Sequence, residues 1–283
     1  MSRSVSPPAK RAAHALSLTA GRVTASLRTL PGFLIVGAQR CGTTSIYRAL
    51  SEHPAVLKPV LHKGVHYFDM NYERGPFWYR AHFPLAASGC RTGGLAFESS
   101  PYYMFHPLAA KRIAADLPEV KLIVLVRDPV ERAYSAHAHE LARGFETESF
   151  ERAIDLESQR LHGEADRIAT EVGYLSHSHQ HHAYVARGRY AEQLSRLERL
   201  FGRGLVHVVD AGDFFAKPEP IYDGVLEFLG LAGSGRGYPE FERHNARPRS
   251  PMAKSVRRKL HEHFVPYDER LTRWLDQVPS WRR

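Results

Sequence analysis

The most informative stretch of the chain is Phe33-Leu34-Ile35-Val36-Gly37-Ala38-Gln39-Arg40-Cys41-Gly42-Thr43-Thr44, residues 33–44. Its first four residues form a short, unbroken apolar run, which is typical of a strand buried on both faces. After the loop that follows, Ile46, Tyr47 and Leu50 recur at helical spacing. A strand, a glycine-bounded loop and a helix in this order predict a phosphate-binding loop, because backbone N–H groups and a helix N-terminus together form an anion site.

This loop departs from the G-x-x-x-x-G-K-[ST] pattern of nucleoside triphosphatases at one position. Thr43 stands where that pattern has the lysine that reaches the β- and γ-phosphates, and a different cation, Arg40, lies inside the loop. Thr43 and Thr44 supply hydroxyl donors instead. These residues favour a phosphate site and argue against a P-loop nucleotide or small-molecule kinase. That kinase stays the main alternative, and magnesium dependence would separate the two.

A second segment, residues 122–135, has the same strand-to-helix form. Five apolar residues, 122–126, predict a central strand, and Asp128 followed by Pro129 predicts a capped helix start. Arg127 then lies at the carboxyl end of the strand, where open α/β sheets bind their ligands. Ser135 lies seven residues after the cap, on the same helix face. Together Arg127 and Ser135 predict a site for a second phosphate.

The two segments together resemble the sulfotransferases that use 3′-phosphoadenosine-5′-phosphosulfate (PAPS), in particular the heparan sulfate type and its bacterial relatives. Residues 127–135 match that family's R-D-P-x-x-R-x-x-S pattern, and the similarity extends over about residues 32–278. The resemblance implies that Arg40 is the catalytic cation and that Arg127 and Ser135 bind the 3′-phosphate. It also implies a basic loop over the nucleotide, in which we prefer Arg247 to Arg249. The residues implied for the 5′-phosphosulfate are Gln39, Arg40, Cys41, Gly42, Thr43 and Thr44.

The catalytic base is the place where the chain departs from that family. Heparan-type relatives carry a glutamate two residues before the histidine of this segment, where the chain has Gly64, and a lysine after the glutamate that corresponds to Glu98, where it has Ser99. His66 is the expected base, because imidazole titrates near neutral pH. Either Asp69 or Glu98 is expected to orient it, and the predicted catalytic set is Arg40, His66 and Glu98. The alternative is that His66 only packs or fixes a loop.

These patterns predict one α/β domain, with a P-loop-containing parallel sheet flanked by helices and the active site along the carboxyl ends of the strands. The domain is expected to span residues 31–283 and to follow a flexible basic tail at residues 1–30. Residues 205–209 predict a further strand. The helical repeat of Tyr190, Leu194, Leu197 and Phe201 indicates core packing.

Composition narrows the class of protein. The chain has 283 residues, 43% hydrophobic and 24% charged, which are ordinary globular values. The net charge of +9 comes from both ends of the chain, and its middle is slightly acidic, so we expect no nucleic-acid partner. Only two cysteines, Cys41 and Cys90, are present, which favours a reduced compartment. No apolar run approaches the roughly 20 residues of a membrane span. We therefore expect a cytoplasmic enzyme without stable membrane insertion.

The predicted reaction is transfer of a sulfuryl group from PAPS, as donor co-substrate, to a hydroxyl or amine of a carbohydrate, glycolipid or small molecule. No metal is expected, although the histidines in residues 177–182 offer an alternative metal site. A non-catalytic nucleotide-binding module is the remaining alternative, and a transfer assay separates it.

Overall fold

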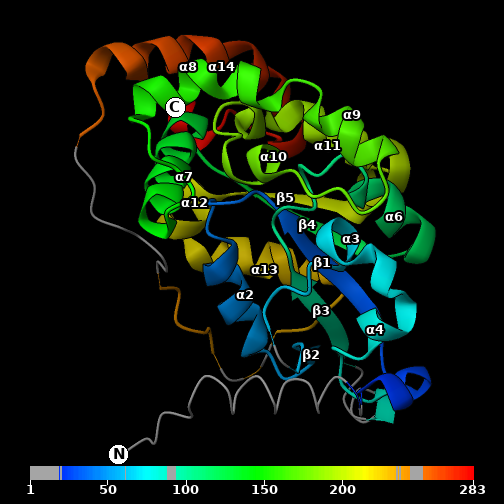
Figure 1. The fold of residues 1–283 in the computed structure, drawn as a ribbon. Helices are drawn as coiled ribbons and strands as arrows, with labels where there is room; N and C mark the ends of the chain where they lie inside the picture. The colour runs from blue at the N-terminus through cyan, green and yellow to red at the C-terminus, as the bar shows by residue number, and fades with distance from the viewer. Residues whose placement is uncertain are drawn as a thin grey trace, which may run out of the picture.

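The computed structural model describes residues 21–60, 62–87, 94–233, 237–242 and 251–283, together with residues 19 and 235. Within them the chain forms a five-stranded sheet with strand order β2-β3-β1-β4-β5, and every neighbouring pair is parallel (Figure 1). The sheet confirms the predicted α/β class. The strands are β1 (Pro31–Gly37), β2 (Val56–Leu57), β3 (Leu95–Ser99), β4 (Lys121–Val126) and β5 (Val206–Asp210).

The middle strand, β1, sets the position of the site. Its apolar run, residues 33–36, is wholly buried, as expected for a strand covered on both faces. β1 pairs with β3 on one side and with β4 on the other. Connections therefore leave β1 and β4 in opposite directions along the sheet, and such a reversal opens a crevice at the carboxyl ends of the strands. Both predicted phosphate segments begin at these two strand ends.

Helices cover both faces of the sheet. In Figure 1, α2 and α13 lie below it, and α6, α11 and α14 lie above it. The α-helices are α2 (Thr43–Ser51), α3 (Tyr67–Met70), α4 (Pro76–Arg80), α6 (Ala109–Asp116), α7 (Pro129–Arg143), α8 (Phe150–Leu161), α9 (Glu164–Thr170), α10 (His177–His181), α11 (Tyr190–Phe201), α12 (Ala211–Ala216), α13 (Pro218–Leu229) and α14 (Lys254–Leu275). Short 3-10 turns are η1 (Ala25–Leu27), η2 (Tyr72–Arg74), η3 (Ala186–Gly188), η4 (Arg203–Leu205) and η5 (Ser280–Arg282).

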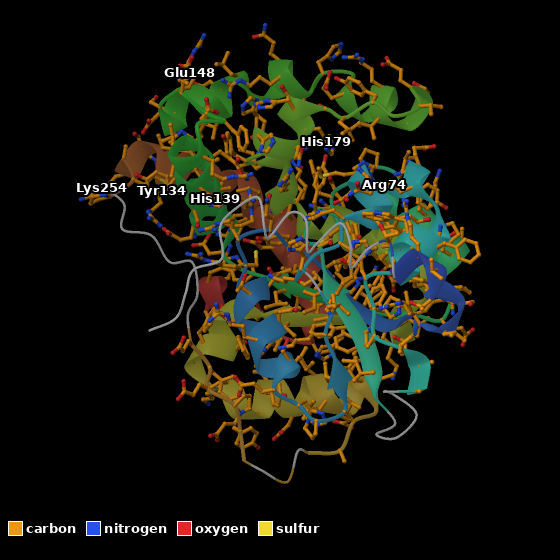
Figure 2. The ribbon with its side chains drawn as sticks, turned by 60° about the horizontal axis from the view of Figure 1, so that its bottom comes forward. Arg74, Tyr134, His139, Glu148, His179 and Lys254 are labelled. Carbon is orange, nitrogen blue, oxygen red and sulfur yellow. The ribbon has the colours of Figure 1, made fainter. Side chains whose placement is uncertain are left out.

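Two apolar clusters hold these layers together. The larger one surrounds the sheet and includes the predicted stripe of α11, whose four residues Tyr190, Leu194, Leu197 and Phe201 are all buried. A second cluster joins α7, α8 and α14. Figure 2 labels Tyr134 on α7 and Lys254 at the start of α14 on the same side of the molecule. The second cluster therefore fixes α7, the helix that carries Ser135, from outside the sheet.

Residues 21–30 are packed against the domain. Ala25 is buried, Arg28 forms an isolated β-bridge with Leu85, and its guanidinium donates to the carbonyl oxygen of Phe83 at 2.5 Å. A flexible basic tail was predicted for residues 1–30 because Ser, Ala and Arg dominate there and acidic residues are absent. Residues 21–30 lie on the domain because Arg28 finds a backbone acceptor 55 residues further along the chain.

Candidate active site at the ends of β1, β3 and β4

Gly42 shapes the loop between β1 and α2. It has a φ of 88° and is the N-cap residue of α2, and a Cβ at this position would lie 3.1 Å from the ring of Phe215. Glycine adopts this left-handed conformation without steric cost, whereas other residues rarely do. The loop therefore delivers the N-terminus of α2 to the end of β1, where the helix dipole favours an anion.

The side chains of this loop differ in what they offer a ligand. Cys41 is wholly buried, its Sγ lies 3.5 Å from the hydroxyl of Tyr190, and burial raises the pKa of its thiol. Cys41 is thus an interior residue that presents only its backbone to the loop. Gln39 accepts a hydrogen bond at Oε1 from the guanidinium of Arg187, which also donates to the carbonyl oxygen of His179 at 2.8 Å. Arg187 therefore ties the loop to the segment around α10.

The start of α7 is built as the sequence predicted. Asp128 caps the helix, with Oδ1 accepting from the backbone N–H of Val130 at 2.8 Å and of Glu131 at 3.4 Å. Arg127, one residue before the cap, has its carbonyl oxygen bonded by the hydroxyl of Tyr190 at 2.9 Å. The end of β4 is therefore fixed on both sides of Arg127, whose side chain remains about one-third exposed.

The two predicted phosphate segments meet in space. Arg40 in the first loop donates from Nε and Nη2 to Oγ of Ser135, both at 3.2 Å, across 95 residues of sequence. Arg127 in turn donates from Nη1 to the carbonyl oxygen of Arg40 at 3.5 Å. Arg40 has a left-handed φ of 72°. The guanidinium predicted to act at the sulfuryl group thus lies beside the predicted 3′-phosphate residue.

Lys63, which the sequence analysis did not assign to the site, also contacts the loop. Its Nζ donates to Oγ1 of Thr43 at 3.3 Å and to Oγ1 of Thr44 at 3.0 Å. Burial lowers the pKa of Lys63 to about 7. The sequence gives one indication that Lys63 belongs to the site, because it lies three residues before the predicted base, His66. Its contact with α2 follows from the path of the chain between β2 and α3, which no periodicity reveals.

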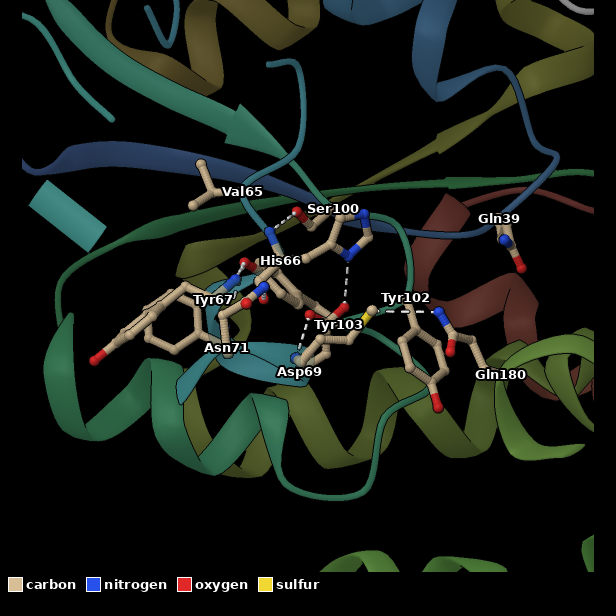
Figure 3. Close-up of polar contacts among 12 residues, drawn as sticks. Gln39, Val65, His66, Tyr67, Asp69, Asn71, Ser100, Tyr102, Tyr103 and Gln180 are labelled. Atoms are coloured by element: carbon tan, nitrogen blue, oxygen red, sulfur yellow. Dashed lines mark hydrogen bonds and ion pairs between the residues drawn. The ribbon is translucent and has the colours of Figure 1, made fainter. Parts of the chain in front are cut away.

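His66 forms a pair with Asp69 at the start of α3 (Figure 3). The backbone of His66 is left-handed, with a φ of 53°, and its Nδ1 donates to Oδ2 of Asp69 at 2.8 Å. Burial lowers the pKa of His66, but the hydrogen bond and charge of Asp69 and the charge of Glu98 raise it, and the pKa lies above its ordinary value. Because Nδ1 faces a carboxylate, Nε2 is the atom that takes up a proton.

Glu98, at the end of β3, lies beneath this pair and is wholly buried. Its Oε2 accepts from the backbone N–H of Val65 at 2.7 Å and from the hydroxyl of Ser100 at 2.6 Å. Its Oε1 accepts from the hydroxyls of Tyr79 at 3.1 Å and Tyr103 at 2.7 Å. Burial raises the pKa of Glu98, and the bonds from Ser100, Val65 and Tyr103 oppose that rise. Its oxygens therefore hold neighbouring groups and do not face a substrate.

Those neighbours in turn hold the backbone around His66. The hydroxyl of Ser100 accepts from the N–H of His66 at 3.0 Å, and the hydroxyl of Tyr103 accepts from the N–H of Tyr67 at 2.8 Å. Glu98 thus reaches His66 through Ser100 and Val65, whereas Asp69 contacts the imidazole directly. Of the two residues expected to orient His66, Asp69 is the one within hydrogen-bond distance of its ring.

Gly64 lets β3 approach this connection closely. A Cβ at Gly64 would lie 2.7 Å from the carbonyl oxygen of Ser99 and 3.0 Å from Oγ of Ser100. The N–H of Ser99 also donates to the carbonyl oxygen of Lys63 at 2.9 Å, and Oγ of Ser99 is buried without a hydrogen-bond partner. No side chain fits at position 64 unless the backbone moves. The two departures from the heparan-type pattern therefore lie side by side.

The remaining predictions fall outside this cluster. Arg247 lies outside the described residues. Histidines of residues 177–182 have separate partners: Nδ1 of His179 pairs with the hydroxyl of Tyr102 at 2.8 Å, and Nδ1 of His181 pairs with Oε2 of Glu140 at 2.9 Å. Among the described residues no group of three or more His, Cys, Asp or Glu side chains is arranged to hold a metal ion.

Comparison with known proteins identifies the family. The family model for the sulfotransferase domain matches residues 30–248, and the chain belongs to that family. A crystal structure of a sulfotransferase from Alicyclobacillus acidocaldarius is 28% identical, with a TM-score of 0.67 over 90% of this chain and 100% of that one. The chain is thus a transferase enzyme of the sulfotransferase class, and the predicted resemblance is confirmed.

Two curated relatives show how far the likeness reaches. The membrane-associated sulfotransferase kil1 of Dictyostelium discoideum is 24% identical over 92% of this chain and 68% of its own length. The bifunctional heparan sulfate N-deacetylase/N-sulfotransferase 3 of Homo sapiens is 31% identical over 71% of this chain but only 22% of its own length. The chain thus spans about a fifth of that bifunctional enzyme. No helix among the described residues is long and apolar enough to cross a membrane.

Proposed function

We propose that the enzyme transfers a sulfuryl group from PAPS to a hydroxyl or amine of a carbohydrate, glycolipid or small-molecule acceptor. One observation carries this proposal: the loop before α2 lies at the strand end next to that of Arg127 and Ser135, and Arg40 of this loop contacts both of these residues. A nucleotide that carries phosphates on both its 5′ and its 3′ positions needs two anion sites a ribose apart. A kinase substrate with a single polyphosphate chain does not.

The residues at these two sites suit such a donor. Thr43, Thr44 and the N-terminus of α2 would bind the 5′-phosphosulfate, and Arg127 and Ser135 would bind the 3′-phosphate through charge-assisted hydrogen bonds. Gln39 and Cys41 would take part through the loop, Cys41 by its backbone alone. The predicted role of Arg247, contact with the adenosine, is also part of this proposal.

The chemistry that these residues supply is proton removal and charge stabilisation. Nε2 of His66 takes the proton of the acceptor hydroxyl or amine as the new bond to sulfur forms and the bond from sulfur to the 5′-phosphate oxygen breaks. Asp69 holds the resulting imidazolium. Arg40, moved from Ser135 toward the transferring group, stabilises the charge that develops on the leaving phosphate. Glu98 is a positioning residue in this scheme, because it touches only the groups that hold His66.

The proposed acceptor site borders Asp69, whose carboxylate binds the imidazole of His66. A cavity of about 170 Å³ has Asp69, Arg112 and residues 168–175 on its wall, and we propose that the acceptor occupies it. The carbohydrate class is favoured by the names of the relatives, one of which acts on heparan sulfate. The glutamate that heparan-type relatives carry is replaced by Gly64, so the acceptor itself is left to experiment.

The test is transfer of labelled sulfate from PAPS to a panel of carbohydrates, glycolipids and small hydroxylated molecules, read by mass spectrometry. We expect a sulfated product whose formation requires no added magnesium. Magnesium-dependent phosphoryl transfer from ATP would identify a kinase instead. Binding of PAPS without transfer to any acceptor and without donor hydrolysis would identify a nucleotide-binding module.

We further propose that the enzyme acts in the cytoplasm. The free, buried thiol of Cys41 suits a reduced compartment, whereas one relative is described as membrane-associated. Fractionation of cells that express the chain decides between them: recovery in the soluble fraction is expected, and recovery with washed membranes would overturn the proposal.

A further inference from the structure

Lys63 is a cation held on the hydroxyl groups at the start of α2. Its ammonium lies 3.3 Å from Oγ1 of Thr43 and 3.0 Å from Oγ1 of Thr44, and 5.7 Å from the centre of the Tyr47 ring. Its carbonyl oxygen is bonded by the N–H of Ser99, which fixes the base of the side chain against β3. The ammonium is therefore aimed at the two hydroxyls nearest the helix N-terminus.

No carboxylate balances this charge. Among the described residues, no Asp or Glu oxygen lies within ion-pair distance of Lys63, and the residue is half-buried. A cation buried without an anion is unfavourable, and burial accordingly lowers the pKa of Lys63 to about 7. Such a group is stabilised when a ligand brings a negative charge to the loop.

We propose that Lys63 is a donor-binding residue whose ammonium contacts the 5′-phosphosulfate end of the nucleotide, beside Thr43 and Thr44. In G-x-x-x-x-G-K-[ST] loops a lysine of the loop itself performs this role, and here Thr43 occupies its place in the sequence. Lys63 supplies the same charge from the β2–α3 connection. This inference rests on the proposed function, because it assumes a nucleotide donor with a 5′-phosphate.

The surroundings of Lys63 make its protonation readable. From α2 it is faced by Tyr47, whose pKa burial raises. From its own connection it is faced by His66, whose pKa is above its ordinary value although the charge of Lys63 opposes that rise. From β3, Ser99 and Ser100 bring no charge to it. With a pKa of about 7, Lys63 is expected to be mainly neutral in the free enzyme at about pH 8, and a phosphate dianion is expected to restore the ammonium form with uptake of a proton.

The experiment is calorimetry with adenosine 3′,5′-bisphosphate at about pH 8, in two buffers of different ionisation enthalpy, so that proton uptake is measured directly. Lys63→Met keeps the length of the side chain and removes the charge. Lys63→Arg keeps a charge that does not titrate. The matched control is Lys58→Met, which removes an exposed lysine from the same connection.

We expect the wild type to take up most of one proton on binding. Lys63→Met should bind the bisphosphate about 10- to 100-fold more weakly, as for loss of one charged hydrogen bond, without proton uptake at this site. Lys63→Arg should retain much of the affinity but take up no proton, and Lys58→Met should match the wild type. Adenosine 3′-phosphate, which lacks the 5′ group, should bind wild type and Lys63→Met equally.

The outcomes separate this inference from the proposed function. A wild type that binds bisphosphate tightly while Lys63→Met binds it equally well, with unchanged proton uptake, overturns the role of Lys63 alone. A wild type that binds no bisphosphate overturns both. Thermal unfolding of Lys63→Met provides the check on folding, and the proton uptake of the wild type is measured without any substitution.

Discussion

Arg127 and His66 both stand beside the end of a strand, but they are held in different ways. Arg127 is held mostly by its own segment, because Asp128 caps the helix that begins two residues later, and one distant group, the hydroxyl of Tyr190, binds its carbonyl oxygen. His66 is fixed from a distance, since Glu98 of β3 binds Val65 and Ser100, and Ser100 binds the N–H of His66. The donor side of the site is therefore built locally, and the side with the base depends on a buried carboxylate from another strand.

The difference between the segment of Arg127 and the connection of His66 indicates where substitutions are tolerated. The segment of residues 127–135 begins its helix through local capping chemistry, and packing of α7 against α8 and α14 then holds that helix in place. The β2–α3 connection has a left-handed residue at its centre and takes its shape from β3. Replacement of the family glutamate by Gly64 lies in this second region, where the backbone of Ser99 occupies the space a side chain would need.

Substitution of His66 should have the largest effect. If His66 is the base, His66→Ala should lower turnover by about 10²–10⁴-fold and leave binding of adenosine 3′,5′-bisphosphate unchanged. Because Asp69 keeps the pKa of His66 above its ordinary value and only neutral imidazole accepts a proton, wild-type kcat/KM should rise with pH through a midpoint above 6.5. His162→Ala, an exposed histidine, is the control. Wild-type turnover in His66→Ala would assign proton removal to another group.

Arg40 should come next in magnitude. Arg40→Ala removes a preorganised donor to the developing charge, which commonly lowers the rate by about 10²–10³-fold, while the bisphosphate product should still bind. Arg40→Lys should keep partial activity, since the charge remains but the planar fork is lost. Steady-state kinetics and calorimetry on the same preparations check this. If Arg40→Ala loses product binding but keeps its turnover at saturation, Arg40 binds a phosphate together with Ser135 and does not act in the chemical step.

Substitutions of Glu98 and Asp128 test the difference between the two regions directly. Glu98→Gln puts an amide among four donors that need acceptors, and we expect a loss of roughly 1–3 kcal/mol of unfolding free energy together with reduced turnover. Asp128→Ala removes only a cap, for about 0.5–2 kcal/mol, and should weaken bisphosphate binding more than turnover. Denaturant unfolding and kinetics measure both. Equal effects of the two variants on turnover and binding would remove the distinction between the two sides.

Local patterns made part of this site predictable. The apolar runs of β1 and β4, the Asp128 cap and the buried stripe of α11 all lie within single segments, where hydrophobic spacing and capping rules apply. The family resemblance assigned Arg40 and Ser135 to separate parts of the donor, and their contact was not predicted, because it spans 95 residues of sequence.

Other features needed the structure. The contact of Lys63 with Thr43 and Thr44 joins two connections through space, and no spacing rule relates them. The burial of Glu98 near His66 could not be predicted either. The sequence pattern of an acidic residue at a strand end is the same whether its carboxylate faces solvent or four hydrogen-bond donors. The exclusion of a side chain at Gly64 depends on the close approach of β3.

The most direct test of PAPS as the donor compares the affinities of adenosine 3′,5′-bisphosphate and adenosine 5′-phosphate. Calorimetry measures both affinities, on the wild type and on Arg127→Ala. The 3′-phosphate should strengthen binding to the wild type by roughly 1.5–3 kcal/mol, the contribution of a charged hydrogen bond. Arg127→Ala should lose most of that difference while its affinity for adenosine 5′-phosphate stays the same. Equal affinity of the wild type for the two nucleotides would contradict a 3′-phosphate site at Arg127 and Ser135, and with it the assignment of PAPS as the donor.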